Sequence, residues 1–237
     1  MSDKYKFLEW DSKFFGFGVA CINNCIDFQE LTDIIEMSKK SGVKLVYYLS
    51  SQEQELIRLN KLCRTSRFAD TKLLYYKKTY FPKSFDKEKV FEYTGKIPTK
   101  DMYVLALESG TYSRFNTDPG IPPGKFNELY CMWIENSVNY KIADKVFCSG
   151  NSDKITGLIT LAKKENTATI GLLSVNEKFR GQRIGSALIS CCENYCVENG
   201  LERLFVYTQK ENIPACNLYR SNGFTIDNIN YVYHLWM

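Results

Sequence analysis

The sequence lacks the cysteine pattern of a metal site or a disulfide framework. It has nine cysteines, an odd number, and none of them forms a CxxC pair. Paired spacing is the usual signature of zinc ligands, and disulfide frameworks belong to secreted chains. We therefore expect reduced thiols, no bound metal and a cytoplasmic location.

The sequence also lacks long hydrophobic runs and clusters of one charge. Its first ten residues, MSDKYKFLEW, hold no apolar run of signal-peptide length, and no segment approaches the ~20 apolar residues of a membrane-spanning helix. Lys and Arg number 31 against 27 Asp and Glu, a formal net charge of +4, and they are spread along the chain. Nucleic-acid binding draws mainly on clustered Lys and Arg. We expect a soluble protein that binds neither a membrane nor a nucleic acid.

The hydrophobic content is sufficient for a substantial core. The chain has 237 residues, of which 44% are hydrophobic and 14% aromatic, enough for one large domain or two small ones. The segment YFPKSFDKEK (80–89) combines proline and charge between apolar stretches, which is typical of a linker. We therefore predict a small α/β amino-terminal domain at 1–80 and a larger domain at 90–237.

Strands and helices are predicted to alternate in the first eighty residues. Asp27 and Glu30 form a capping box at the start of a helix that Gly42 stops. Runs of β-branched and aromatic residues predict the strands. The predicted elements are a strand region at 6–22, a helix from Asp27 to about Lys40, a strand at 44–50, a helix capped by Ser51 and Gln54 that ends near Leu62, and a strand from Phe68 to Lys78.

The second domain shows the same alternation. Phe126, Leu129, Tyr130 and Trp133 share approximate helical spacing, and Gly200 is a natural helix stop. The predicted elements are a strand at 102–109, a loop at 110–124, a helix at 125–138, a hairpin at 154–175 that turns near 164–166, a helix at 186–199, a strand at 203–209, a helix at 214–221 and a strand at 229–236.

The two domains carry a weak internal echo. Phe68 and Tyr75 have the same spacing as Phe224 and Tyr231, and KLVYYLS before a helix resembles RLFVYTQ before a helix. Two interpretations stay open. The amino-terminal domain is either a degenerate half-copy of the carboxyl-terminal unit, or a β-α-β unit that shares only its composition.

The stretch FRGQRIG (179–185) predicts a phosphate site. It follows the strand TIGLLSV closely and leads into an amphipathic helix. Glycines permit backbone angles that leave amide hydrogens free to converge on an anion at the start of a helix, and Arg180 and Arg183 add positive charge. The stretch lacks the Gly-Lys-Ser/Thr ending of a P-loop and the glycine spacing of a dinucleotide-binding turn. The anion is therefore expected outside the usual nucleotide folds.

Two motifs together resemble the GNAT superfamily of N-acetyltransferases. RGQRIG (180–185) resembles its pyrophosphate-binding loop, which cradles acetyl-coenzyme A. NIPACNLYRSNGF (212–224) resembles its second signature, in which an asparagine, an alanine, a Leu-Tyr pair and a Gly-Phe pair recur at this spacing. The resemblance implies an α/β protein with the GNAT acetyltransferase fold, a mixed twisted sheet flanked by helices, preceded here by the smaller α/β amino-terminal domain.

A looser resemblance covers most of the chain. LEWDSKFFGFGVA (8–20) and YSRFNTDPGIPPGKFNELYCMWIENSV (112–138) are similar to the TDP-amino-sugar acetyltransferases typified by TDP-fucosamine acetyltransferase (WecD-like). This resemblance implies acetyl-CoA as cosubstrate and direct transfer to the amine of a nucleotide-linked (TDP) amino-deoxy sugar. A homodimer is one possible assembly.

Two alternatives stay open beside the sugar acetyltransferase. One is a GNAT enzyme that acts on a protein amino terminus, a lysine or a polyamine. The additional amino-terminal domain and the SRF-containing loop argue against it. The other is a non-catalytic acetyl-CoA sensor, and the presence of Tyr219 argues against that.

The resemblance assigns roles to residues of both motifs. The main chain at 173–175 would pair with the pantetheine arm like an added strand. The loop at 180–186 would hold the diphosphate, and the amides of the second motif would contact the coenzyme arm. The residues expected to bind acetyl-CoA are Leu173, Ser174, Val175, Arg180, Gly181, Gln182, Arg183, Ile184, Gly185, Ser186, Asn212, Ala215 and Asn217. The alternative roles are helix capping for Asn212 and solvent exposure for Asn217.

The expected chemistry needs a proton donor for the departing thiolate. Tyr219 occupies the family position that supplies this proton, and a phenol with a reference pKa of about 10 is a donor at neutral pH. A backbone amide near Val175 could polarise the thioester carbonyl. Many GNAT enzymes carry a glutamate on the central strand as base, but here GLLSV offers Ser174 and no carboxylate. We expect water to take the amine proton, with Glu177 as a weaker candidate.

The acceptor side is predicted from three residues of the middle segment. Arg114 is expected to bind the nucleotide diphosphate, because a guanidinium can hold phosphate through two hydrogen bonds. Phe115 and Tyr130 are expected to line the sugar or thymine pocket, although core packing is an equal alternative for both. The lone histidine, His234, is expected to be a structural or rim residue.

Overall fold

The computed structural model divides the chain into two compact units that interleave in sequence. It describes residues 4–24, 27–82, 89–151 and 153–237. The first unit comprises Met1–Lys72, Thr117–Lys125 and Ile229–Met237, and the second comprises Leu73–Asn116 and Phe126–Asn228. The sequence predicts one domain before positions 80–90 and one domain after them. In the structure, the strands β4 (Ser66–Lys78) and β10 (Thr225–Trp236) each contribute residues to both units. Positions 83–88 of the predicted linker lie outside the described residues.

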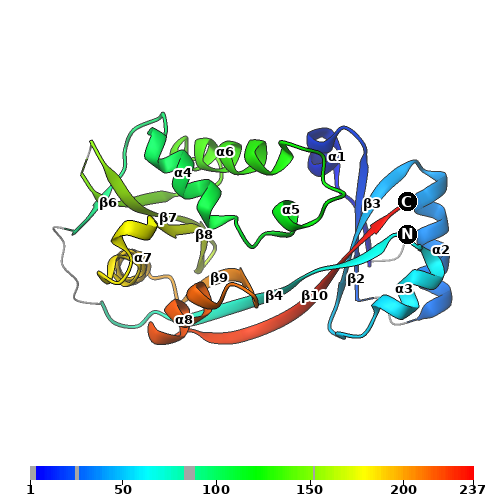
Figure 1. Cartoon of the computed structure of the whole chain (residues 1–237). Helices are drawn as coiled ribbons and strands as arrows, with labels where there is room; N and C mark the ends of the chain where they lie inside the picture. The colour runs from blue at the N-terminus through cyan, green and yellow to red at the C-terminus, as the bar shows by residue number, and fades with distance from the viewer. Residues whose placement is uncertain (1–3, 25–26, 83–88, 152) are drawn as a thin grey trace. The chain divides into compact units, whose positions relative to one another are not determined.

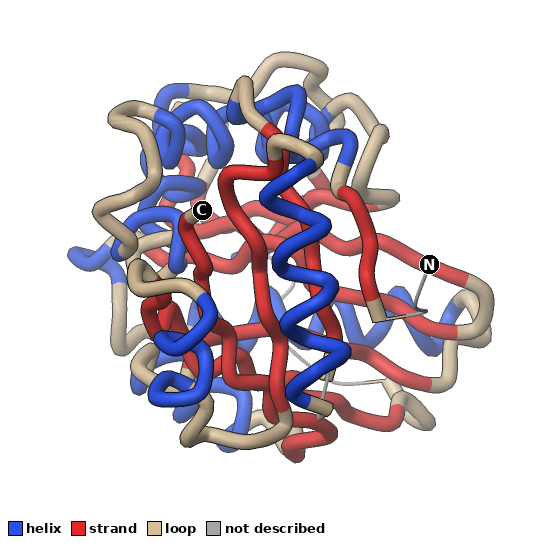
Figure 2. The backbone as a smooth tube through the Cα atoms, turned by 90° about the vertical axis from the view of Figure 1, so that its right-hand side faces the viewer, coloured by secondary structure: helices blue, strands red, loops and turns tan. Residues whose placement is uncertain are grey.

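The sheet of the first unit has the strand order β1-β2-β3-β10-β4. β1 and β2 are antiparallel, β2 and β3 are parallel, and β3 and β10 are antiparallel. Figure 2 shows helix lying across one face of the strands on this side of the molecule. The elements are β1 (Tyr5–Phe7), α1 (Glu9–Phe15), β2 (Gly18–Asn23), α2 (Phe28–Lys40), β3 (Val43–Ser50) and α3 (Leu56–Leu62), together with parts of β4 and β10.

Local sequence signals explain most of the first unit. The Asp27 side chain accepts a hydrogen bond from the Glu30 amide at 2.7 Å, which confirms the predicted cap of α2. The cap predicted for α3 is wrong, because α3 begins after Glu55 and has no side-chain cap there. The strand predicted across 6–22 is also wrong in its middle, where α1 ends at Gly16 with a φ of +79°. The aromatic residues of this stretch favour strands, but Phe14 and Phe15 are adjacent buried residues of a helix.

The sheet of the second unit has the strand order β10-β4-β9-β8-β7-β6-β5. β5 to β8 pair antiparallel in sequence order, and β8 and β9 are parallel. In Figure 1, α4 and α6 lie above the strands β6 to β8 and α7 lies below them. The elements besides β4 and β10 are β5 (Val90–Glu92), α4 (Lys100–Ser109), α5 (Arg114–Thr117), α6 (Lys125–Val138), β6 (Lys145–Gly150), β7 (Ile155–Lys164), β8 (Thr167–Val175), the 3-10 turn η2 (Glu177–Phe179), α7 (Ile184–Glu198), β9 (Arg203–Gln209) and α8 (Ile213–Ser221).

The strand predicted at 102–109 is wrong, since this segment lies in helix α4. The Thr99 side chain caps the helix by accepting a hydrogen bond from the Met102 amide at 3.4 Å. Met102, Leu105 and Ala106 are buried, at the i, i+3 and i+4 spacing of one helical face. The short helix α5 likewise lies in the predicted loop at 110–124. The helix at 125–138, the hairpin and the elements that follow it occur where they were predicted, with small changes at their ends.

The strand order bears on the internal echo. The two echoing segments are β3-α3-β4 and β9-α8-β10. In the first unit β10 lies between β3 and β4, and in the second unit β4 lies between β10 and β9. Each segment thus has one strand of the other between its own two strands. This correspondence favours the half-copy interpretation, which stays a prediction.

The described residues contain neither a membrane-spanning helix nor a cluster of metal ligands. Within 4–24, 27–82, 89–151 and 153–237, no helix has the length and apolar character to cross a bilayer. The same residues contain no group of three or more His, Cys, Asp or Glu side chains that could hold a metal ion. The cysteines that the structure describes carry free thiols.

Candidate active site

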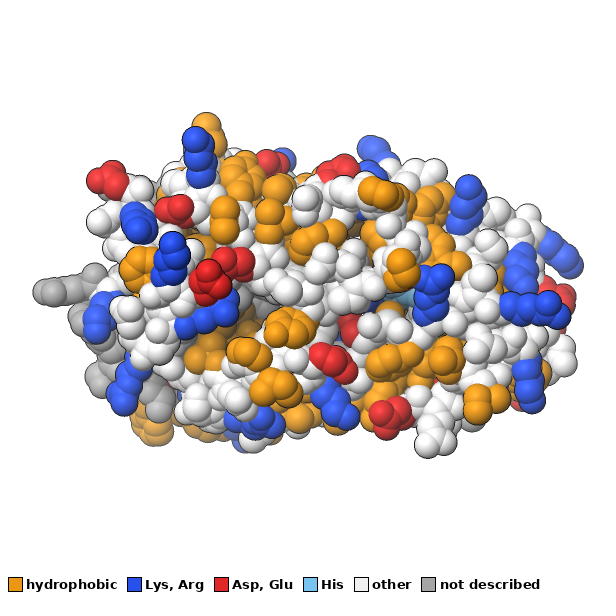
Figure 3. All heavy atoms as spheres, viewed as in Figure 1, with side chains coloured by type: hydrophobic (Ala, Val, Ile, Leu, Met, Phe, Trp, Pro, Cys, Tyr) orange, Lys and Arg blue, Asp and Glu red, His pale blue; other side chains and the backbone are white. Residues whose placement is uncertain are grey.

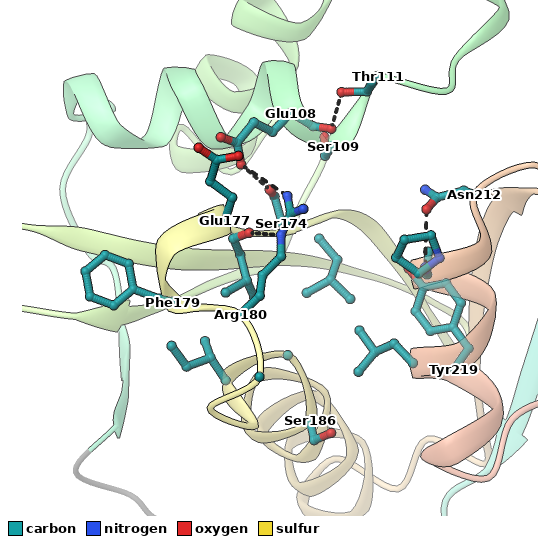
Figure 4. A pocket seen from close by; sticks show the side chains of 18 of the residues that line it. Glu108, Ser109, Thr111, Ser174, Glu177, Phe179, Arg180, Ser186, Asn212 and Tyr219 are labelled. Atoms are coloured by element: carbon teal, nitrogen blue, oxygen red, sulfur yellow. Dashed lines mark hydrogen bonds and ion pairs between the residues drawn. The ribbon is translucent and has the colours of Figure 1, made fainter.

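A pocket of about 650 Å³ lies within the second unit. It is bounded by the end of α4, the end of β8, the loop that follows β8, and the first turns of α7 and α8 (Figure 4). Its lining residues are Glu108, Ser109, Thr111, Tyr112, Leu173, Ser174, Val175, Glu177, Phe179, Arg180, Gly181, Arg183, Ile184, Gly185, Ser186, Asn212, Pro214, Ala215, Leu218 and Tyr219.

The loop before α7 has the geometry of an anion-binding helix start. Gly181 has a φ of +79° and Arg183 a φ of +60°, so the chain turns twice through the left-handed region before the helix begins. Arg183 is the N-cap residue and provides no side-chain cap, which leaves the first amides of α7 for another acceptor. Ile184, Gly185 and Ser186 line the pocket at this helix start. Backbone amides at such a position favour a phosphate or another anion.

Strand β8 has one edge suited to pairing with an extended ligand. Its parallel register with β9 runs from Thr167 to Ile170, whereas the strand itself continues to Val175. Leu173, Ser174 and Val175 lie beyond that register and line the pocket. An extended chain can add to such an edge through main-chain hydrogen bonds.

Three side chains meet at one side of the pocket. The Ser174 hydroxyl donates a hydrogen bond to Oε2 of Glu108 at 3.3 Å. The Arg180 guanidinium lies 3.9 Å from the same Glu108 oxygen, and its Nε donates to the Val175 carbonyl at 3.0 Å. Figure 4 shows these side chains converging from α4, β8 and the loop. In Figure 3, acidic and basic side chains lie side by side between the positions of α4 and α7, next to a hollow in the surface.

Tyr219 lies on the opposite side of the pocket, on α8 (Figure 4). Its side chain is buried and packs against the tilted rings of Tyr75 and Phe224, with centroid distances of 5.7 and 5.8 Å. Burial raises the pKa of the Tyr219 phenol, and the neighbouring Cys216 and Tyr75 raise it further. The phenol is therefore protonated at neutral pH.

A buried ion pair fixes the helices that carry the pocket. The Lys77 ammonium on β4 contacts the Glu193 carboxylate on α7 and the Asn222 carbonyl at the end of α8. The Asn222 amide in turn donates to the Ser186 hydroxyl at 3.1 Å, at the start of α7. The side chains of Lys77 and Glu193 are 16% and 4% exposed, so this pair is shielded from solvent. It links the second motif to the glycine loop through a strand from the amino-terminal half of the sequence.

The structure brings most of the predicted coenzyme residues together. Eleven of the thirteen predicted coenzyme residues line the pocket, as does the predicted proton donor Tyr219. The eleven are Leu173, Ser174, Val175, Arg180, Gly181, Arg183, Ile184, Gly185, Ser186, Asn212 and Ala215. Gln182 and Asn217 lie outside this lining, and the exposed Asn217 accepts a hydrogen bond from Arg220 at 2.7 Å. Asn212 caps α8 by accepting a hydrogen bond from the Ala215 amide at 3.2 Å.

Sequence reasoning missed the contribution of α4 to the pocket. Glu108 and Ser109 end that helix, and Thr111 and Tyr112 follow it. The strand predicted at 102–109 gives no reason to expect its last residues in the site. The signal that could have found them is the helical spacing of the buried residues behind the Thr99 cap.

The three predicted acceptor residues lie near one another in sequence but outside the pocket lining. Arg114 and Phe115 belong to α5, and the Arg114 guanidinium lies 4.4 Å from the Phe115 ring centroid. Tyr130 on α6 is buried between Phe126 and Trp133, at centroid distances of 4.9 and 5.6 Å. Their contact with an acceptor therefore stays a prediction.

The lone histidine is buried in the first unit. Nδ1 of His234 lies 2.6 Å from Oδ2 of Asp118, and the indole of Trp236 donates to the same oxygen at 2.9 Å. The Gly120 amide donates to the other carboxylate oxygen at 2.9 Å. Burial alone would raise the pKa of Asp118, but these hydrogen bonds, above all the one with His234, lower it to about 2. This arrangement agrees with a structural role for His234.

Comparison with known proteins shows the fold and a similarity to one enzyme family. Residues 114–224 match the model of the Acetyltransferase (GNAT) family. A crystal structure of a GCN5-related N-acetyltransferase from Sphaerobacter thermophilus aligns with 97% of this chain and 75% of that chain, with a TM-score of 0.61 and 14% identity. The chain thus has the GNAT fold, which confirms the fold predicted from the two motifs, and its residues 114–224 are similar to the GNAT family of acetyltransferases.

Two curated relatives add more specific similarity. The chain is 28% identical to the spore coat polysaccharide biosynthesis protein SpsD of Bacillus subtilis (strain 168) over 138 residues, which cover 58% of this chain and 47% of SpsD. It is 32% identical to a streptothricin acetyltransferase of Escherichia coli over 78 residues, which cover 32% of this chain and 45% of that protein. Each alignment spans somewhat less than half of the relative.

Proposed function

We propose that the protein is an acetyl-CoA-dependent N-acetyltransferase that acetylates the amine of a nucleotide-linked (TDP) amino-deoxy sugar by direct transfer. The observation that carries the proposal is the loop at 180–186, which makes an uncapped, positively charged helix start in the pocket that Tyr219 also lines. A diphosphate with an extended arm and a thioester at its end matches the three parts of this pocket.

Each part of the pocket has a role in this proposal. The amides of α7, with Arg180 and Arg183, hold the coenzyme diphosphate. The main chain at 173–175 pairs with the pantetheine arm. Acetyl-CoA supplies the thioester carbonyl, and Tyr219 donates a proton to the thiolate that leaves it.

The acceptor is the more specific part of the proposal. SpsD is named for polysaccharide biosynthesis, and the segments at 8–20 and 112–138 resemble TDP-amino-sugar acetyltransferases. Arg114 is proposed to bind the nucleotide diphosphate, with Phe115 and Tyr130 beside the sugar or base. The similarity to a streptothricin acetyltransferase makes another small-molecule amine the second candidate.

The test is a panel of amines offered to the purified full-length protein with acetyl-CoA. We would include TDP-4-amino-4,6-dideoxygalactose, streptothricin, spermidine and a peptide with a free amino terminus, and would measure the release of free coenzyme thiol and the mass of the product. Acetylation of the TDP-amino sugar with the highest kcat/KM supports the proposal. Binding of acetyl-CoA without acetylation of any amine would indicate a sensor.

Gly181→Val is expected to weaken acetyl-CoA binding. A residue with a Cβ at a φ of +79° costs roughly 1–2 kcal/mol, so the loop will shift away from the geometry that cradles the diphosphate. The added Cβ meets no atom within 4 Å, so the fold should survive. Isothermal titration calorimetry on a variant with unchanged circular dichroism would measure the loss.

Gly200→Val is the matched control for that loss. Gly200 has a φ of +67°, with nothing within 4 Å of an added Cβ, and lies beyond the carboxyl end of α7. It should lose stability without losing coenzyme affinity. Equal coenzyme affinity in both variants and in the wild type would contradict the assignment of the loop.

Arg114→Ala is expected to raise the KM for a TDP-amino sugar by roughly 10- to 100-fold, the effect of losing a charge-assisted hydrogen bond of about 1.5–3 kcal/mol. The affinity for acetyl-CoA should stay nearly unchanged, because Arg114 lies outside the pocket lining. Steady-state kinetics and calorimetry would separate the two. A parallel loss of both affinities would instead identify a structural arginine.

A further inference from the structure

The pocket holds one carboxylate against the strand on which the acetyl group is expected to lie. Glu108 comes from the last turn of α4, and its Oε2 accepts the hydrogen bond of Ser174 on β8 at 3.3 Å. The Glu108 side chain is 29% exposed, so a ligand in the pocket can reach it. We infer that Glu108 binds the acceptor amine and takes its proton, an inference that rests on the proposed function.

The positions of Glu108 and Tyr219 suit opposite ends of one reaction. Figure 4 shows Glu108 entering the pocket from α4 and Tyr219 from α8, with the end of β8 between them. The incoming nitrogen and the departing sulfur occupy different positions on the carbonyl carbon. A base near the nitrogen can therefore take its proton while an acid near the sulfur protonates the thiolate.

The charge of Glu108 also selects the acceptor. The Arg180 guanidinium lies 3.9 Å from Oε2 of Glu108, and the Arg180 side chain is 59% exposed. Such a long and solvated ion pair contributes little to stability. A diphosphate on the loop would draw Arg180 away from the carboxylate, because guanidinium binds phosphate strongly. An ammonium ion then replaces Arg180 as the partner of Glu108, so an occupied coenzyme site favours a cationic amine.

The reaction balances with these two groups. Glu108 accepts one proton from the ammonium ion, and the neutral nitrogen forms a bond to the acetyl carbonyl carbon. The carbon–sulfur bond breaks, and the thiolate takes the Tyr219 proton. The nitrogen loses two protons in all. One passes through Glu108 to water, and the second restores the proton that Tyr219 gave to the thiolate.

The test compares the full-length protein with Glu108→Gln, using acetyl-CoA and TDP-4-amino-4,6-dideoxygalactose. Glutamine keeps the shape and a hydrogen-bonding oxygen for Ser174 but cannot accept the proton. We expect kcat/KM at pH 7 to fall by about 10²–10⁴-fold, the range for a positioned base. We also expect the rate of the variant to recover as the pH rises toward the pKa of the free amine. Without a base in the site, only amine that is already neutral can react. A merely structural glutamate would not change the pH profile in this way.

Calorimetry with acetyl-CoA separates damage to the pocket from loss of the base. Glu108→Gln should bind acetyl-CoA as tightly as the wild type or more tightly, because Arg180 loses its carboxylate partner. Glu177→Gln tests the other carboxylate that lines the pocket, and Glu198→Gln, at the exposed end of α7, is the control. A larger loss in Glu177→Gln than in Glu108→Gln would transfer the role to Glu177.

The remaining outcomes are distinct. An active wild type with an unchanged Glu108→Gln variant overturns this inference and leaves the proposed function intact. A rise in KM alone, with the pH profile unchanged, shows that Glu108 binds the ammonium ion without taking its proton and overturns the base. A wild type that binds acetyl-CoA and acetylates no amine refutes the proposed function, and this inference with it.

Discussion

Replacing Tyr219 with phenylalanine is expected to lower kcat by about 10²–10⁴-fold, the usual range for a positioned general acid. Phenylalanine preserves the ring and its packing against Tyr75 and Phe224 but removes the phenol proton of a residue that lines the pocket. Burial raises the pKa of the phenol, so it keeps its proton throughout the neutral range until the thiolate forms. Burial also raises the basicity of a thiolate that forms beside it.

The measurement is kcat under conditions in which chemistry limits turnover, together with calorimetry for acetyl-CoA. Coenzyme affinity should be retained, because the hydroxyl acts after binding. Tyr75→Phe is the matched control, since Tyr75 is a buried phenol of the same cluster outside the pocket lining. Its kcat should stay close to that of the wild type. Wild-type kcat in Tyr219→Phe would return Tyr219 to a packing role.

Features that depend on local sequence could be predicted. The glycines and arginines that predict the anion site lie within seven residues. Gly181 adopts the left-handed angle that glycine permits, whereas Gly185 lies inside α7 and the left-handed Arg183 was not predicted. The Asp27 cap and the helix at 125–138 are equally local. Each of these signals acts through backbone geometry and side-chain spacing over one or two turns.

Features that depend on distant pairing could not be predicted. No local signal shows that β4 and β10 each serve two compact units, because both strands read as ordinary β segments and their neighbours are chosen by long-range packing. The same limit hid Lys77, whose ion pair joins residues 116 positions apart. For Glu108 the error was local, since the apolar residues of α4 also suit a short buried strand and length and caps must decide between the two.

The Asp118 cluster also lies beyond local prediction, since TDPG (117–120) resembles an ordinary turn. In the first unit the Asp118 carboxylate is almost fully buried, with contacts from His234, Trp236 and the Gly120 amide. Arg67 adds an ion pair at 3.3 Å. These partners hold a charged carboxylate in the core, where an unpaired charge would be costly.

Asp118→Asn is therefore expected to lower the free energy of unfolding by about 2 kcal/mol at pH 7, with a pH dependence that identifies the cause. The pKa of Asp118 is lowered from 3.8 in the unfolded chain to about 2 in the folded protein, and each pKa unit corresponds to roughly 1.4 kcal/mol.

A group whose pKa is lowered by folding contributes its full stability above the unfolded value. That contribution is lost as the pH falls through the folded value. The difference between wild type and variant should shrink steadily as the pH falls from about 5 toward 2. Urea unfolding followed by tryptophan fluorescence across this pH range would measure the difference in stability. Asp33→Asn is the control, because Asp33 is an exposed residue on α2 in the same unit and its replacement should change the stability little at any pH. A loss of stability in Asp118→Asn that stayed the same from pH 7 to pH 2 would mean that packing, and not the buried carboxylate charge, is what the substitution removes.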